Sequence, residues 1–594
     1  MPSMRAACFP ILLAVGCAQP QANRAGGGST SGDAGGAAGA AGIPASGGTG
    51  GLSSTGGSAG SGGSRSTGGS IGTGGGPATG GATGGATGGS SARGGAPGTG
   101  GTASSGGSTG SGGVSPKGGS PGTGGSPGTG GGSAKGGSTG TGGSTGGGGS
   151  AGTGGVSSSG GSTGMGSCSF TVISNAISTK MATVGVVEWS TTLASPSSAQ
   201  IVYALNNAAT GVLNKGGTAP VNLAKANYRT LLLGLKQSSD YTFHIEATSG
   251  GTTCKSSDYT LPKTGALSGA PSVTRTVTTA AAQAGGFIIT SAGLQGSGAY
   301  ILDADGAIVW YFASPTQCSR ARMDYEGVNM WMMSLNVGNT GGEMRFVSMD
   351  GQTSQTNVAG LDKTHHDFAV LPGKIASMYW AATGTDPESN LVEHAADGSG
   401  STTTVFKIGS NLYVGGSSAM GGGAGTYHCN SILYHPSDDS YTIGDRNPNL
   451  YVKVKHDGTP VWQIGGSCTN AKAPKCAAGT WSVNHGHDLD ATSGDLLIFN
   501  NGRSGAAHLL EFQIVETASS ITATSVKDYS PGATSNVLGD VQRLPNGNTL
   551  VTFSTGGQIV EVDPSWGTVQ TIKAGSGAFG YSEWRPTMYG PPER

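Results

Sequence analysis

Asp-Gly pairs recur through the second half of this chain, and each lies between two short runs of strand-forming residues. The pairs begin at residues 305, 350, 397 and 457, with runs such as YIL before Asp305-Gly306 and IVWY after it. Asp-Gly is a preferred pair for the tight turn of a β-hairpin, because Gly accepts the positive φ that this turn needs. We therefore expect hairpin after hairpin and almost no helix.

Two further segments extend this series towards the C-terminus. A strand-like run at 509–514 is followed by a hairpin whose turn is Ser565-Trp566-Gly567, and a second hairpin type with Leu-Pro before its turn occurs at 368–373 and 541–551. Together they make six units of roughly 45–60 residues. Units of this length with four short strands are typical of a β-propeller. We expect a six-bladed propeller over residues 265–594, and a count of seven blades stays open.

Residues 18–167 have a composition that cannot form a core. Most of the 116 Gly lie before residue 167, mixed with Ser, Thr and Ala and with almost nothing apolar to bury. Burial therefore cannot offset the entropy of ordering this segment, which is expected to be a disordered, flexible linker. No strict period of three persists, which excludes collagen. A structured Gly-rich fibre is the alternative.

The first 17 residues are expected to be a lipoprotein-type signal peptide. Arg5 supplies a positive start, and the apolar run at 9–15 is too short to span a bilayer. The run ends in LAVGC, which resembles a bacterial lipobox, so Cys17 is the expected lipidation site. Lipid on Cys17 would anchor the protein without a transmembrane helix. We expect an exported lipoprotein of the outer membrane or cell surface, on its periplasmic or extracellular face; an ordinary secretory signal is the alternative.

Six cysteines remain after residue 17, and an exported chain can oxidise them to disulfides. One pair brackets a short Lys/Pro loop, a second lies at the two ends of a small domain, and a third is left by subtraction. These pairs are Cys468–Cys476, Cys168–Cys254 and Cys318–Cys429. None of the six has CxxC spacing, so no structural zinc site is expected.

Residues 168–264 show short alternating strands, typical of a β-sandwich. Trp189 lies on the second strand, where it can fill a core, and LxGLKxxxxYxFxIxA spans residues 232–247. This pattern resembles a fibronectin type III domain. The resemblance implies a spacer, and we find no candidate site in it.

Four polar clusters interrupt the strand pattern of residues 265–594, and they contain five of the ten His in the chain. They are His365-His366-Asp367, His428-Cys429-Asn430, Asp445-Arg446, and His485-Gly486-His487-Asp488. We expect strand ends to bring them together in one pocket, with His487 as the reactive centre. Any one such His is more often structural than catalytic. The five imidazoles are also enough for a zinc or copper site, although no HExxH spacing is present, so no metal is assigned.

The clusters and the strands around them resemble, in order, the bacterial arylsulfate sulfotransferases, or arylsulfotransferases. The matching pieces are THHDFAVLP (364–372), YHCNSI (427–432), GDR (444–446), VWQIG (461–465), HD (487–488) and IFNNG (498–502). The resemblance covers most of residues 265–594. It implies a six-bladed propeller that uses no nucleotide sulfate donor and no cofactor. It further implies transfer of a sulfuryl group from a phenolic sulfate ester to a phenol through a sulfohistidine.

The resemblance also implies roles for individual residues. His487 would be the nucleophile; His428, Arg446 and His366 would bind sulfate oxygens or protonate the leaving phenolate; Asn430, His365 and Asn501 would bind substrate. His366 is preferred to His365 because it precedes Asp367 as His487 precedes Asp488. Two departures stand out: Asn500 occupies a position that is usually acidic in the family, and NHGHD replaces the more usual QHD.

The residue types suit this chemistry. A sulfuryl group keeps negative charge on its oxygens, which Arg binds in bidentate fashion. An imidazole attacks only when it is neutral. The expected partners are an aryl sulfate, a phenolic acceptor and, through the lipid, a membrane. A net charge of -1 and the lack of a basic stripe exclude nucleic acid. The alternative function is a non-catalytic, surface-anchored propeller that binds glycans or protein partners.

Overall fold

The computed structural model describes residues 168–335, 342–380, 389–409, 411–416, 427–502 and 506–592. The predicted signal peptide (1–17), the lipidation of Cys17 and the whole predicted linker (18–167) lie outside these residues. Regular structure in the described part is β-strand, apart from two 3-10 turns at Ala226–Tyr228 and Ala280–Ala282. The expected all-β class is confirmed. No helix in this part of the chain has the length and apolarity to cross a membrane.

The small domain contains two antiparallel sheets. The first consists of β1 (Phe170–Ile177), β2 (Gly185–Thr191) and β5 (Thr230–Leu232). The second consists of β4 (Gly216–Pro220), β3 (Ser198–Leu205), β6 (Tyr241–Ser249) and β7 (Thr252–Lys255), with β8 (Tyr259–Leu261) also paired to β6. Trp189 on β2 is fully buried and belongs to the same apolar cluster as Tyr203 on β3 and Phe243 on β6. Trp189 therefore fills a core, as predicted. The fibronectin type III resemblance stays a prediction.

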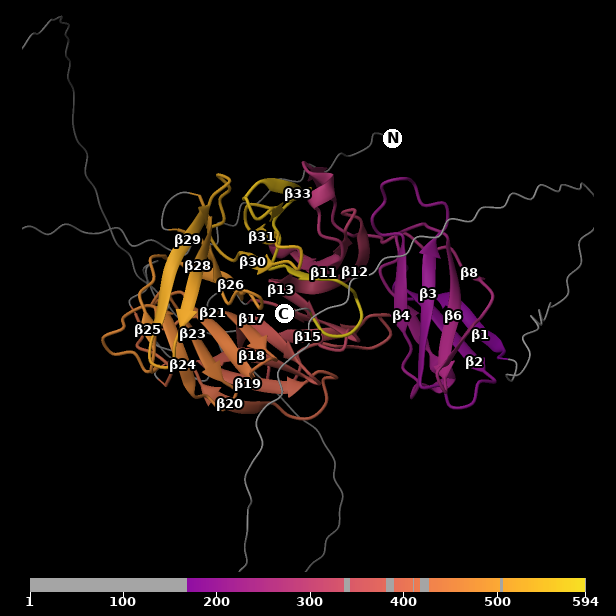
Figure 1. Cartoon of the computed structure of the whole chain (residues 1–594), viewed down its shortest axis with the longest axis horizontal. Helices are drawn as coiled ribbons and strands as arrows, with labels where there is room; N and C mark the ends of the chain where they lie inside the picture. Colours follow the sequence, from indigo (N-terminus) through magenta and orange to yellow (C-terminus); the bar gives the residue numbers. More distant parts are fainter. Residues whose placement is uncertain are drawn as a thin grey trace, which may run out of the picture. The chain divides into compact units, whose positions relative to one another are not determined.

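The remaining strands form six further sheets (Figure 1). Three of them are β34 (Glu583–Arg585), β10 (Phe287–Ser291), β11 (Gly293–Asp303) and β12 (Ile308–Cys318); β13 (Arg320–Met323), β14 (Asn329–Met333), β15 (Met344–Ser348) and β16 (Ser354–Gln355); and β17 (Thr364–Leu371), β18 (Lys374–Trp380), β19 (Ser389–Ala395) and β20 (Thr403–Lys407).

The other three follow in chain order. They are β21 (Cys429–His435), β22 (Ser440–Asp445), β23 (Leu450–Lys455), β24 (Pro460–Gly465) and β25 (Cys476–Ala477); β26 (Asn484–Leu489), β27 (Leu496–Asn500), β28 (His508–Glu516) and β29 (Ile521–Tyr529); and β30 (Asp540–Arg543), β31 (Thr549–Phe553), β32 (Gln558–Val562), β33 (Thr568–Ala574) and β9 (Val273–Val277). Each sheet thus corresponds to one repeat unit of the sequence.

The predicted Asp-Gly hairpins are present. Every one of them connects the third strand of a sheet to the fourth, as Asp457-Gly458 connects β23 to β24. Gly458 has a φ of +86°, and the carboxylate of Asp457 accepts the N–H of Thr459 at 2.9 Å. Gly supplies the left-handed conformation and Asp supplies an acceptor for the turn's own backbone. The repeated pair therefore fixes where each outermost strand begins.

The two ends of the large domain exchange strands. The C-terminal β34 pairs with β10 in the first sheet, and the early β9 pairs with β33 in the last sheet. The equivalent strands of neighbouring sheets, β34, β13, β17, β21, β26 and β30, contact one another, and we call them the inner strands. Figure 1 shows most of them side by side at the middle of the large domain.

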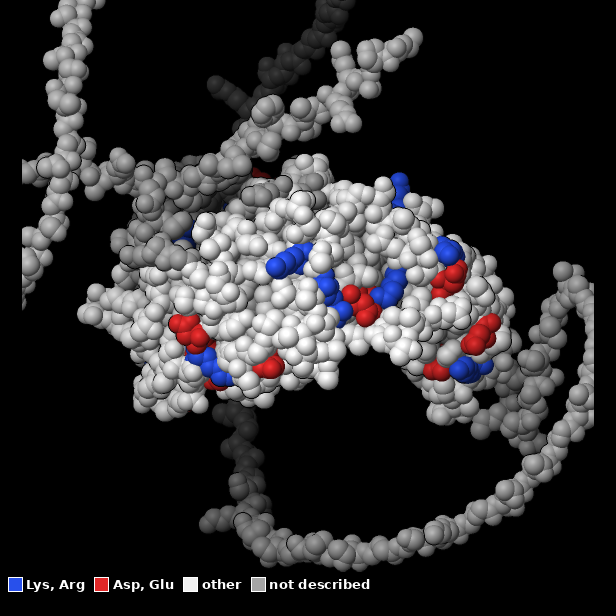
Figure 2. Space-filling model, turned by 90° about the horizontal axis from the view of Figure 1, so that it is seen from above, with Lys and Arg blue, Asp and Glu red and all other residues white. Residues whose placement is uncertain are grey.

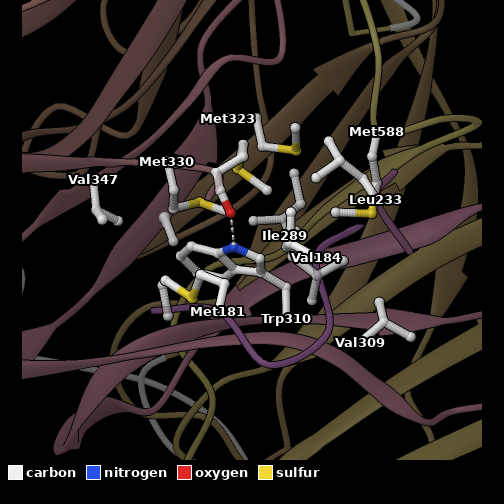
Figure 3. Close-up of a cluster of buried hydrophobic side chains, with 14 of the residues drawn as sticks. Met181, Val184, Leu233, Ile289, Val309, Trp310, Met323, Met330, Val347 and Met588 are labelled. Carbon is white, nitrogen blue, oxygen red and sulfur yellow. Dashed lines mark hydrogen bonds between the residues drawn. The ribbon is translucent and has the colours of Figure 1, made fainter. Parts of the chain in front are cut away.

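A single apolar cluster joins the small domain to the first two of the six sheets (Figure 3). Met181 and Leu233 of the small domain pack there with Trp310 of β12 and Met588 near the C-terminus. The indole of Trp310 donates to the carbonyl oxygen of Met349 at 2.9 Å. The small domain is therefore packed against the sheets through a common core rather than merely tethered to them.

Two of the three expected disulfides are present, Cys168–Cys254 and Cys468–Cys476. The third expectation was wrong, because Cys318 and Cys429 are unpaired and buried. Cys318 ends β12 in the first sheet and Cys429 begins β21 in the fourth, and they belong to different apolar clusters.

Charged side chains are sparse, with 31 Lys and Arg and 32 Asp and Glu in the whole chain. On the face in Figure 2, blue and red groups are scattered and mixed in sign. Several lie in pairs, such as Arg229 with Asp350 at 2.6 Å. The densest charge pairing of the large domain is buried among its inner strands.

Candidate active site

The inner strands bring the predicted polar clusters together. The carboxylate of Asp367 on β17 accepts the N–H of Ile432 on β21 at 3.1 Å. The amide of Asn430 on β21 in turn donates to the carbonyl oxygen of Asn484 on β26 at 2.6 Å. Three of the four sequence clusters therefore meet where β17, β21 and β26 run side by side. Arg446, directly after β22, joins them because its N–H donates to the carbonyl oxygen of His428 at 3.0 Å.

Each of these three strands is irregular at its polar residues. The register slips between Thr364 and Phe368 on β17, between Cys429 and Ser431 on β21, and between Asn484 and His487 on β26. A bulge adds residues to one strand and re-aims its side chains. His366 also has a φ of +59°, a conformation that is uncommon for residues other than Gly. The local backbone is therefore bent at all three places where imidazoles meet.

Gly486, between the two His of β26, is required by close packing. Its N–H donates to the carbonyl oxygen of Gly539, and a Cβ there would lie 2.7 Å from that oxygen and from Cα of Asp540. Real Cβ atoms essentially never approach so closely. The departure from the family pattern, His-Gly-His, thus has a steric cause in the contact between β26 and β30.

Four imidazoles and one guanidinium form what we call the histidine cluster: His365, His366, His428, His485 and Arg446. Nε2 of His366 lies 3.0 Å from Nε2 of His428, and Nδ1 of His365 lies 3.2 Å from Nδ1 of His366. A guanidinium nitrogen of Arg446 lies 3.5 Å from Nδ1 of His428. No member exposes more than 5% of its surface.

His485 belongs to this cluster by its electrostatics. Its charge contributes to lowering the pKa of both His366 and His428, and the charge of Arg446 contributes to lowering the pKa of His485. Burial is the largest cause in each case and brings the pKa of His485 to about 3. All these imidazoles are consequently neutral at neutral pH.

Asn501 fixes the tautomer of His485. The amide nitrogen of Asn501 donates to the carbonyl oxygens of Ser535 at 2.6 Å and Leu538 at 2.8 Å, so its oxygen must face Nδ1 of His485, with which it hydrogen-bonds. Nδ1 of His485 therefore carries the proton, and Nε2 carries the lone pair. In this structure Asn501 orients an imidazole, and its binding of substrate stays a prediction.

His487 lies apart from the histidine cluster. Its Nδ1 is 2.8 Å from the hydroxyl of Ser431, its Nε2 is 2.7 Å from the hydroxyl of Thr442, and its ring packs 4.7 Å from that of Tyr451. These partners belong to the sheet that begins with β21. On a regular strand His485 and His487 would share a face, but the bulge between Asn484 and His487 separates them. The structure thus brings His366, His428, His485 and Arg446 together and leaves His487 outside.

Asp445 braces the segment that holds His428 and Arg446. One carboxylate oxygen accepts the N–H groups of His428 and Asn447, each at 2.9 Å, and the other accepts the hydroxyl of Tyr413 at 2.8 Å. Burial raises the pKa of Asp445 to about 6. Its bonds to backbone hold His428 and Arg446 in a fixed relation.

A buried ionic network on the inner strands was not predicted. Arg320 bonds to Asp367 at 2.6 Å and to Asp540 at 2.5 Å, and Arg322 bonds to Glu583 at 2.6 Å. Burial alone would raise the pKa of Asp367, but Arg320 and Arg322 hold it below its usual value. The sequence signal was the alternation of two Arg with Ala321 and Met323 along one short strand.

Asn430 also serves the scaffold in this structure. It is fully buried, its amide nitrogen bonds to β26, and its side-chain oxygen has no partner among the described residues. Those residues also include no group of three or more His, Cys, Asp or Glu arranged to hold a metal ion.

Comparison with known proteins gives one family match. Residues 420–575 match the model of the family described as arylsulfotransferase (ASST), and this range contains His428, Arg446, His485 and Asn501. No curated protein sequence matches the chain.

Among solved structures, the chain resembles the periplasmic gluconolactonase PpgL of Pseudomonas aeruginosa, with 15% identity, 50% of this chain and 98% of that chain covered, and a TM-score of 0.33. A putative 6-phosphogluconolactonase of Bacteroides fragilis NCTC 9343 has 12% identity, coverages of 66% and 99%, and a TM-score of 0.34. A Bacteroides caccae protein of unknown function has 12% identity, coverages of 50% and 98%, and a TM-score of 0.34. Residues 420–575 of this chain are thus similar to the arylsulfotransferase family, which supports the family resemblance of this part of the sequence.

Proposed function

We propose that this protein transfers a sulfuryl group from an aryl sulfate to a phenol, without a nucleotide donor, at the histidine cluster. One observation carries the proposal: three inner strands place four imidazoles and one guanidinium at a single buried point, most of it within the family-matched range. Arg446 is the cluster's only fixed cation and suits the oxygens of a sulfuryl group. The six sheets with exchanged end strands support a six-bladed propeller as the scaffold.

His485 is the better-placed nucleophile in this proposal. Its proton is held on Nδ1 by Asn501, and the lone pair on Nε2 is available for attack. In the first step Nε2 bonds to sulfur while the bond from sulfur to the aryl oxygen breaks, and its electron pair goes to that oxygen, which an imidazole of the cluster protonates. In the second step the oxygen of an acceptor phenol bonds to sulfur, the bond between nitrogen and sulfur breaks, and the proton of the phenol passes to an imidazole of the cluster.

His487, which the motif position favours, remains the alternative nucleophile. Both of its ring nitrogens already lie within 2.8 Å of hydroxyl groups, so an attack would first require a hydrogen bond to break. Although His485 and His487 are only two residues apart, substituting each one alone distinguishes which of them is the nucleophile.

The test measures phenol-dependent release of 4-nitrophenol from 4-nitrophenyl sulfate by the purified protein. His485→Ala is expected to abolish release, whereas His487→Ala is expected to retain a measurable rate. His508→Ala is the matched control, because His508 pairs with Asp528 at the surface and is 37% exposed. No phenol-dependent release by the wild type would refute the proposed function. Mass spectrometry of the sulfated enzyme then assigns the sulfated residue, and sulfate on His487 would overturn the choice of His485.

We also propose that the protein is exported and held at a membrane by lipid on Cys17. The two disulfides support an oxidising compartment. Cys17→Ser is expected to move the protein from the membrane fraction to the soluble fraction and to abolish labelling by a radioactive fatty acid. Unchanged labelling in that variant would contradict lipidation at this residue.

A further inference from the structure

Three imidazoles of the histidine cluster form a continuous chain of hydrogen bonds. From Arg446 the chain runs to Nδ1 of His428, across the His428 ring to His366, across that ring to His365, and on to the hydroxyl of Ser389. The successive separations are 3.5, 3.0, 3.2 and 2.8 Å. Every member is at least nine-tenths buried.

Arg446 sets the direction of every hydrogen in this chain. A guanidinium can only donate, so Nδ1 of His428 accepts. His428 is neutral and carries its single proton on Nε2, which donates to Nε2 of His366. By the same reasoning His366 carries its proton on Nδ1 and donates to Nδ1 of His365. His365 then carries its proton on Nε2, which donates to the hydroxyl oxygen of Ser389.

All protons of this chain therefore point away from Arg446. If Nδ1 of His428 receives an extra proton, each ring can pass one on to the next without any side chain turning. We infer that His428, His366 and His365 act as one proton relay, which takes up a proton with the aryl sulfate, lends it to the leaving phenolate and recovers it from the acceptor phenol. This inference rests on the proposed function.

The proton balance closes over both steps. Binding of the aryl sulfate anion draws Arg446 to its oxygens, frees Nδ1 of His428 and adds one proton to the relay. When the bond from sulfur to the aryl oxygen breaks, its electron pair goes to that oxygen, and the relay proton follows it, so that a neutral phenol leaves. The acceptor phenol returns a proton to His428 as its oxygen displaces Nε2 of His485 from sulfur. Product release then frees that proton.

The surroundings explain why the proton arrives with the anion. In the free protein burial is the main cause that lowers the pKa of the relay imidazoles, and the positive charge of Arg446 lowers that of His428 and His366 further. An anion bound at Arg446 reverses this charge. The other titratable groups nearby are His485, which is neutral, Asp445, which accepts backbone N–H groups, and Asp367, which Arg320 and Arg322 neutralise. Cys429 and Tyr413, beside Asp445, have a raised pKa because of burial and stay neutral.

The experiment measures how many protons the full chain takes up when it binds benzenesulfonate at pH 7. The method is isothermal titration calorimetry. Benzenesulfonate presents a sulfonate on an aromatic ring but has no ester oxygen, so it binds without reacting. Binding heats measured in buffers of different ionisation enthalpy give the number of protons taken up. About one proton per bound sulfonate is expected for the wild type.

The outcomes are distinct. No binding of benzenesulfonate together with no turnover would refute the proposed function itself. Binding without proton uptake would overturn the relay and leave the proposed function standing. Uptake that is unchanged in both His365→Phe and Ser389→Ala would limit the proton to His428 and His366 and overturn the extended relay.

Ser377→Ala is the matched control for Ser389→Ala. Ser377 lies on the neighbouring strand β18, is equally buried, and its hydroxyl has no hydrogen-bond partner among the residues that the structure describes. Proton uptake by this variant should equal that of the wild type.

A kinetic arm separates a relay from a merely structural role. His365→Phe is expected to slow turnover of phenyl sulfate, a donor with a basic leaving group, by about 100-fold. Its loss of rate with 4-nitrophenyl sulfate, whose leaving group needs no proton, should be at least about tenfold smaller. Equal losses for both donors would overturn the inference. If His365→Phe does not fold, nitrogen NMR of the wild type decides: protons on Nε2 of His428 and His365 and on Nδ1 of His366 are expected, and any other pattern refutes the relay.

Discussion

The orientation of His485 by Asn501 gives the sharpest prediction. Asn501→Leu keeps the volume of the side chain but removes three hydrogen bonds, to Nδ1 of His485 and to the carbonyl oxygens of Ser535 and Leu538. A buried hydrogen bond contributes about 1 kcal/mol net, so the variant should lose about 3 kcal/mol of stability. It should still fold, at a lower melting temperature.

The effect on catalysis follows from the tautomer. Without an acceptor at Nδ1, nothing holds the lone pair on Nε2. Loss of a buried bond worth about 1–3 kcal/mol, at 1.36 kcal/mol for each factor of ten, lowers kcat/KM for the aryl sulfate by about 10- to 100-fold.

The assay combines kcat/KM for 4-nitrophenyl sulfate with thermal unfolding of the same sample. Asn390→Leu is the matched control, because Asn390 is a partly buried amide whose oxygen has no partner within the described part of the chain. A folded Asn501→Leu protein with kcat/KM within about twofold of the wild type would refute the role of Asn501 in orienting the nucleophile.

Three other predictions concern pH, packing and covalent structure. Because burial brings the pKa of His365 and His485 to about 3, whereas a free imidazole titrates near ~6.5, the unfolded chain binds protons that the folded chain does not. Stability is therefore complete above about pH 6.5 and falls as the pH is lowered towards 3, which thermal unfolding from pH 8 to 4 would measure; a constant melting temperature would contradict the burial of neutral imidazoles. Gly486→Ala should destabilise the protein by about 1–3 kcal/mol, because its Cβ meets Gly539 and Asp540, whereas Gly494→Ala, at an open turn, should cost no more than its φ strain. Replacing both Cys468 and Cys476 with Ser opens a loop of 8 residues and should lower the free energy of unfolding by about 2–3 kcal/mol, measured by urea denaturation and compared with the wild type under reduction.

The sequence predicted the outer parts of the sheets well, because local chemistry decides them. A turn such as Asp457-Gly458 has one favoured backbone shape, and the alternating residues beside it can form only strands. The two disulfides that were predicted correctly join cysteines that are close for simple reasons, a short loop and the ends of one small domain. Cys318 and Cys429 were paired only because they remained after the other two pairs, and no structural reason placed them close together.

For the site, the sequence predicted which polar clusters come together at neighbouring strands but not the direction of each side chain. Alternation assigns a face to each side chain only while the register is regular, and the register slips on β17, β21 and β26. His487 was preferred to His485 for its position in the family motif, and residue order does not show the bulge that separates the two side chains. The charge pairs of Arg320 and Arg322 were missed for a different reason: their partners Asp367, Asp540 and Glu583 lie on three other sheets.

The exchange of end strands has a consequence for how the protein is made. The pairing of β9 with β33 and of β10 with β34 joins residues about 300 positions apart. Such distant contacts are slow to form, because the entropy of closing a long loop is lost before any of them stabilises the fold. The pairing of β10 with β34 cannot form until Glu583–Arg585 has been synthesised. A chain stopped before those residues would expose the strand edge of β10 and lack Met588 from the core in Figure 3. The first sheet is therefore completed only by β34, and a nascent chain stays open at this edge until its C-terminal strand has been synthesised.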